Sequence, residues 1–122
     1  MLYRIEAYIN QSWYGIYRAP WTFDSQTKAK IAEASEWLEC PDIDGLYLFT
    51  EEGYKLFREF VYPIFNSEGI RCKYSISVTI YNEITDGLLF RDKHQVATKL
   101  FGSGLKSVKW ILLYDGINNE EN

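Results

Sequence analysis

Residues 70–82, "IRCKYSISVTIYN", carry the clearest structural signal in the chain. Apolar and polar side chains alternate through the segment, beginning with Ile70 and Arg71 and ending with Ile80 and Tyr81. A period of two is that of a β-strand with one face on a core and the other toward solvent. The segment therefore predicts a long strand in a sheet that is covered on one side.

The segments around this strand predict the rest of a sheet. Residues 83–90, "EITDGLLF", are typical of a hairpin turn at Asp86-Gly87 followed by a short returning strand. Residues 2–10, "LYRIEAYIN", alternate like the first segment and predict a second half-buried strand. Residues 45–50 and 108–115 are apolar at both parities, which favours interior strands covered on both faces, or strands whose second face is partly covered by rings.

Two helices are expected between these strands. Residues 24–39 combine good helix formers with Asp24 or Ser25 as the N-cap. Residues 50–65 begin with Thr50 as a second N-cap, and their apolar residues fall on one broad helical face.

Two further features complete the predicted elements. Pro63 should end or kink the second helix near Tyr62, because proline has no backbone N–H to donate. Residues 92–102 predict a third, shorter helix that starts at Asp92 and stops at Gly102.

This order of elements predicts an α+β fold, a mixed or mostly antiparallel sheet of about five strands with two main helices packed on it. No repeat or linker divides the chain, so we expect a single domain over residues 1–116 and an acidic disordered tail over 117–122.

The composition is globular, acidic and rich in rings. The chain has 122 residues with a net charge of −4, and 17% of them are aromatic. Its two cysteines and one histidine are too few for a structural zinc site, and we recognise no cofactor motif. There is no export signal and no apolar run long enough for a membrane span, so we expect a cytoplasmic protein without metal or cofactor that does not act at a membrane.

One segment fits neither a clean strand nor a helix. Residues 11–23, "QSWYGIYRAPWTF", hold the ring and arginine types that protein interfaces enrich. Two interpretations stay open, because a small domain with this many rings must also place some of them in its core. The candidate contacts with a partner protein are Trp13, Tyr14, Tyr17, Arg18 and Trp21.

Acidic side chains gather between the first helix and the second. From Asp24 to Glu59 there are nine acidic residues against four basic ones. The spacing does not match a calcium-binding loop, and a surface for a basic partner explains the acids better than a cation site does. The acidic candidates are Glu39, Asp42, Asp44, Glu51 and Glu52.

Two alternatives use other residues. A nucleic-acid-binding module would use the basic polar face of the strand over residues 70–82 and the segment that follows, with Arg71, Lys73, Tyr81, Arg91 and Lys93 as contacts. A small enzyme would use His94, the only histidine, as a base oriented by Asp92 or a neighbouring acid. No nucleophile motif accompanies His94, which makes the enzyme the weaker alternative.

The sequence thus indicates a binding protein and names no family. A small, acidic, single-domain α+β chain without cofactor motif or catalytic constellation has a profile shared with toxin-neutralising immunity proteins and with phage-encoded inhibitors of bacterial defence, anti-CRISPR proteins among them. Our leading hypothesis is a protein that inhibits or neutralises a partner protein by occluding its surface.

Overall fold

The computed structural model describes residues 1–21, 24–39, 44–67, 74–83, 87–99 and 105–116. Within these ranges, seven strands form one sheet in the order β5-β6-β3-β1-β4-β7, and β2 pairs with β1 beside this path. Every pairing is antiparallel. The predicted α+β class is confirmed, with seven strands in place of about five.

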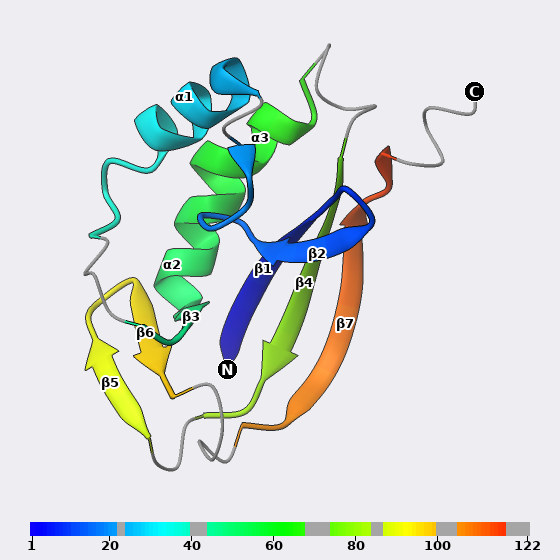
Figure 1. Ribbon diagram of the computed structural model, residues 1–122. Coiled ribbons are helices and arrows are strands. Elements are labelled where there is room, and N and C mark those ends of the chain that lie inside the picture. The colour runs from blue at the N-terminus through cyan, green and yellow to red at the C-terminus, as the bar shows by residue number, and fades with distance from the viewer. Residues whose placement is uncertain (22–23, 40–43, 68–73, 84–86, 100–104, 117–122) are drawn as a thin grey trace.

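The strand β1 (Leu2–Ile9) is the centre of the sheet. It pairs with β4 (Ser75–Tyr81) along one edge and, along the other, first with β3 (Leu46–Phe49) and then with β2 (Ser12–Gly15). The sheet ends in β7 (Ser107–Tyr114) on one side and, beyond β3, in β6 (Gln95–Thr98) and β5 (Leu88–Arg91) on the other (Figure 1).

The helices lie on one face of this sheet (Figure 1). Asp24 caps α1 (Ser25–Ala34) and Thr50 caps α2 (Glu51–Leu56), each by accepting a backbone N–H three residues on, as the sequence predicts. Their apolar faces pack on the odd-numbered side chains of β1, and this interface is the main core. Its buried members include Ile5, Ala7, Ile9, Ile31, Phe49, Phe57, Val61, Phe65, Ile76 and Val78.

The second helix does not pass Pro63 as one regular α-helix, although the chain remains helical. The chain passes from α2 through one π-helical turn, η2 (Phe57–Val61), into α3 (Tyr62–Phe65), with Pro63 in the first turn of α3. The N–H of Tyr62 reaches back to the carbonyl of Phe57, which is the wide spacing of a π-helix. The widened turn lets the helix continue past a residue that cannot donate a hydrogen bond.

The predicted helix over residues 92–102 is wrong. Gln95–Thr98 is the strand β6, and its four side chains are all buried between β3 and β5. Asp92 accepts hydrogen bonds from the backbone N–H groups of His94 and Gln95, at 2.8 and 2.9 Å, so it closes the β5–β6 turn. An aspartate that caps a turn and one that caps a helix look alike in sequence.

The predicted hairpin between the strand over residues 70–82 and residues 88–90 is also wrong. β5 pairs with β6, and the strands β6, β3 and β1 separate it from β4, whose neighbours are β1 and β7. The φ of Gly87 is 72°, as a turn requires, while Asp86 lies outside the described residues. The predicted tail over 117–122 and the first residues of the long strand, 70–73, lie outside them as well.

Candidate functional site

Three rings meet on the face of the sheet that the helices leave uncovered. Tyr8 of β1 contacts Trp13 of β2 with ring centroids 5.1 Å apart, and Trp13 meets Trp110 of β7 edge-on at 6.1 Å. The exposed fractions of Trp13 and Trp110 are 38% and 53%. The two tryptophans therefore support each other while much of their surface stays open to a partner.

Small side chains beneath the rings allow this contact. Trp13 is level with Tyr8 and thus with Ser75 of β4, whereas Trp110 is level with Thr79. The line between the two rings therefore crosses Ser77, whose side chain is completely buried. The polar face of β4, predicted to be wet, is instead covered at Ser75 and Ser77.

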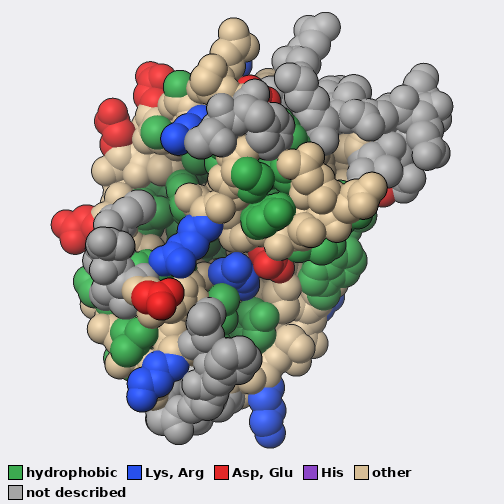
Figure 2. Space-filling view, viewed as in Figure 1, with side chains coloured by type: hydrophobic (Ala, Val, Ile, Leu, Met, Phe, Trp, Pro, Cys, Tyr) green, Lys and Arg blue, Asp and Glu red, His purple; other side chains and the backbone are tan. Residues whose placement is uncertain are grey.

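The strand β7 extends the exposed surface to an edge of the sheet. Val108 and Leu112, on either side of Trp110, are 58% and 38% exposed. Within the described part of the chain, β7 pairs with β4 alone, so its outer backbone groups face away from the sheet. The sequence predicts an interior strand here, or a strand whose second face is partly covered by rings. The interior position is wrong, because β7 is an edge strand with apolar side chains in the open (Figure 2). We call Tyr8, Trp13, Val108, Trp110 and Leu112 the open-face cluster.

The other sequence candidates in the Trp13–Trp21 segment point elsewhere. The Trp21 ring is only 4% exposed, and its Nε1 donates to the carbonyl of Ile16 at 2.8 Å, so this ring belongs to the core. Tyr17 and Tyr14 are half-buried against the core, and the Tyr17 hydroxyl shares a hydrogen bond with Ser35. Arg18 is exposed, with its guanidinium 4.9 Å from the centre of the Tyr47 ring.

The acidic candidates lie at the opposite end of β1 from Trp13. Glu51 and Glu52 follow β3, which meets β1 at Tyr3, whereas Trp13 pairs with Tyr8. Glu51 lies 4.0 Å from the amino group of Met1, and Glu52 lies 3.6 Å from Lys93. Glu39 and Asp44 are exposed as well, and Asp42 lies outside the described residues. The structure thus does not bring the exposed rings and these acids into one surface.

The nucleic-acid candidates do not form a single basic face among the described residues. Arg91 and Lys93 each lie 3.6 Å from a carboxylate, that of Glu83 and Glu52 respectively. Tyr81 packs half-buried against a second apolar cluster formed by Leu2, Leu48 and Val96, and burial raises the pKa of its hydroxyl. Arg71 and Lys73 lie outside the described residues.

The enzyme alternative needs an acidic side chain that orients the His94 imidazole. The carboxylate of Asp92 accepts backbone N–H groups, so it does not orient the His94 imidazole. That ring instead packs edge-on against Trp37 with centroids 5.3 Å apart. No group of three or more histidine, cysteine or acidic side chains in the described ranges is placed to hold a metal ion.

Val108, Trp110 and Leu112 are the residues that sequence reasoning missed. Their signal was present, because an apolar strand interrupted by lysines is also what an edge strand with a partner looks like. Without strand order, that interpretation cannot be told from an interior strand.

Over the described part of the chain, no helix is both long enough and apolar enough to cross a membrane. Comparisons with protein-family models, with curated proteins and with solved structures found no match.

Proposed function

We propose that the protein binds another protein through the open-face cluster and the free edge of β7, and inhibits it by occluding its surface. The observation that supports this most directly is the contact between Trp13 and Trp110, two tryptophans that remain exposed on the helix-free face. Tryptophan is the residue type most enriched among the anchors that dominate binding energy, and a rigid pair loses little conformational freedom on binding.

The edge strand supplies a second means of binding. An unpaired edge offers a row of N–H and C=O groups to any extended chain, and folded proteins usually protect such edges. On β7 the protection is slight, because the exposed side chains of Val108, Trp110 and Leu112 are interrupted only by Lys109. Strand addition here would continue the sheet and place the partner's side chains beside the two tryptophans.

The charge of this edge indicates the chemistry of the partner. Lys106 and Lys109 are exposed at β7, although the whole chain has a net charge of −4. An added strand with alternating apolar and acidic side chains would complement both features. A second copy of this chain is a poorer match, because antiparallel pairing of β7 with itself about Trp110 brings the two Lys109 side chains onto the same face.

Selection from a displayed library of random peptides of about twelve residues tests the proposal without a known partner. We expect enrichment of sequences that alternate apolar and acidic residues. Binding should fall by at least about tenfold in Trp110→Ala and in Lys109→Glu. Phe60→Ala is the matched control, since Phe60 is 48% exposed but lies on the helical side.

Peptides that bind Trp110→Ala and wild type equally would overturn the proposed surface, and so would self-association that Trp110→Ala abolishes. The inhibitory part has its own test. A protein that carries a selected sequence and is captured from the host should lose its activity when one equivalent of this chain is added. Retained activity at saturation would leave a binding protein that does not inhibit.

A further inference from the structure

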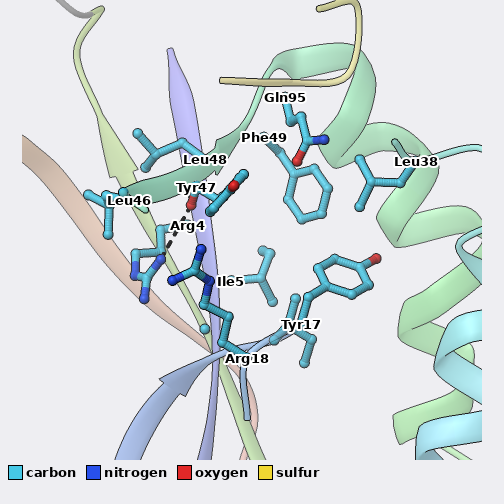
Figure 3. A pocket seen from close by; sticks show the side chains of 13 residues that line it. Arg4, Ile5, Tyr17, Arg18, Leu38, Leu46, Tyr47, Leu48, Phe49 and Gln95 are labelled. Atoms are coloured by element: carbon cyan, nitrogen blue, oxygen red, sulfur yellow. Dashed lines mark hydrogen bonds between the residues drawn. The ribbon is translucent and has the colours of Figure 1, made fainter. Parts of the chain in front are cut away.

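A hollow of about 290 Å³ opens where the neighbour of β1 changes from β3 to β2. β3 meets β1 only at Tyr3, and the pairing with β2 extends only to Glu6, so Arg4 and Ile5 lie between the two contacts. Both residues line the hollow, as do residues of β3 and of the chain after β2 (Figure 3). Its volume is at the lower end of the range for small-molecule sites.

Two arginines form one wall. Arg4 Nη1 donates to the carbonyl of Tyr47 at 3.3 Å, and the guanidinium of Arg18 lies over the ring of the same tyrosine. Both cations thus converge on Tyr47 (Figure 3), and the carboxylate of Glu6, which pairs with Arg4 at 3.3 Å, is not part of the described lining. Converging guanidinium groups repel each other and favour an oxyanion, which they bind through parallel N–H donors.

Arg4 is held in place for such a contact. Its Nε donates to Glu6 at 3.3 Å, while its Nη2 has no acceptor among the described residues. The Nη2 atom rests against Gly15, where an added Cβ would lie 3.1 Å away. The guanidinium is therefore oriented through two of its nitrogens, and the third is available.

The rest of the hollow is mainly apolar, with the amide of Gln95 at one side. Ile5, Ile16, Leu38 and Phe49 are buried side chains from the main core, and the Phe49 ring is part of the lining (Figure 3). Gln95 is 4% exposed and its Nε2 donates to the carbonyl of Glu39. Its Oε1 points toward Phe49 and makes no hydrogen bond among the described residues (Figure 3). An amide oxygen without a donor can accept a hydrogen bond from a polar group of a ligand.

We propose that this hollow binds a small molecule that joins an oxyanion, a carboxylate or a phosphate, to a flat apolar ring. The oxyanion lies against Arg4 and Arg18, and the ring lies between Tyr47 and Phe49. This ligand class follows from the two ends of the lining, and it does not depend on the partner protein proposed above.

Titration with phenyl phosphate and with benzoate, followed by NMR signals of the backbone amides and the arginine Nε–H groups, tests the proposal. We expect saturable shifts at Arg4, Arg18 and Gln95 for at least one of the two probes, and the better probe identifies the oxyanion. Arg18→Gln should lower the affinity for that probe by at least about tenfold. The matched control is Arg58→Gln, because Arg58 lies over Tyr62 at 4.6 Å as Arg18 lies over Tyr47, but on the helices. The Arg58→Gln variant should bind the probe with the affinity of wild type.

Three outcomes would overturn the proposal. If inorganic phosphate binds as tightly as phenyl phosphate, the ring does not contribute to binding. If benzyl alcohol binds as tightly as benzoate, the oxyanion does not contribute. If the signals of Arg4 and Arg18 show no saturable shift up to about 10 mM of either probe, the hollow does not bind this class of ligand. Arg18 is the chosen variant because it is exposed, whereas a change at Arg4 also removes a contact between β1 and β3.

Discussion

Ser77 lies under the line that joins the two exposed tryptophans, and its hydroxyl has no hydrogen-bond partner among the described residues. A fully buried, unsatisfied hydroxyl costs free energy that an apolar side chain of similar size does not. We expect Ser77→Ala to raise the free energy of unfolding by about 1 kcal/mol, measured by urea denaturation. Ser12→Ala, at an exposed position of β2, is the control and should change little. A loss of stability in Ser77→Ala would show that the hydroxyl has a partner.

The turn between β1 and β2 holds backbone strain. Asn10 and Gln11 join Ile9 to Ser12 with φ values of 50° and 66°, which is the left-handed region at both positions of a two-residue hairpin loop. Gln11→Gly should therefore stabilise the protein by about 1 kcal/mol. The same change at Gln26, exposed in α1, should have the opposite sign, because glycine weakens a helix by a similar amount. If thermal unfolding shows that Gln11→Gly and Gln26→Gly change the stability in the same direction, the assigned turn is wrong.

Tyr74 links the first helix to the start of β4. Its hydroxyl donates to Oδ2 of Asp24 at 2.7 Å, and burial, followed by this hydrogen bond, raises the pKa of Tyr74 above its ordinary value of 10.0. Below that value both the folded and the unfolded state keep the proton. At higher pH the unfolded state loses it first, so stability falls as pH rises.

Tyr74→Phe should accordingly be less stable than wild type near neutral pH and should lose less stability between about pH 9 and about pH 11. The decline will not vanish, because burial also raises the pKa of Tyr3 and Tyr81. Urea titrations at each pH measure it, and an alkaline decline of unchanged slope would count against the Tyr74 environment described here.

At the scale of elements, β7 combines an apolar sequence with an edge position. If its exposed side chains serve binding, their removal should hardly affect folding. We expect Trp110→Ala and Leu112→Ala each to lower the free energy of unfolding by less than about 1 kcal/mol. Ile111→Ala, on the helix side of the same strand, should cost more because Ile111 packs against the main core. If denaturation experiments show a larger loss of stability for Trp110→Ala and Leu112→Ala than for Ile111→Ala, the open-face cluster has a structural role.

Local rules predicted some elements and not others. The caps at Asp24 and Thr50 and the alternation of β1 could be predicted because each depends on residues close in sequence. The strand β6 could not, because its burial comes from β3 and β5 on either side, and Asp92 suits a turn as well as a helix start. The open-face cluster could not be predicted either, because Trp13 and Trp110 meet only through the order of the strands, and no local sequence pattern gives that order.

At the scale of the whole molecule, the two faces of the sheet differ in what covers them. The helices cover one face and form the main core, whereas the other holds the open-face cluster. The hollow opens between β2 and β3, across β1 from β4 and β7. Such a division keeps changes in the exposed surface from disturbing the fold, which suits the binding function proposed above.

Amide hydrogen exchange of the chain with and without a selected peptide tests strand addition at β7, because it shows where the added strand forms its hydrogen bonds. We expect new protection at outward-facing amides of β7, Ser107–Tyr114, with little change at β5 on the opposite edge. Protection confined to β5 or to the helices, with β7 exchanging as in the free protein, would contradict it.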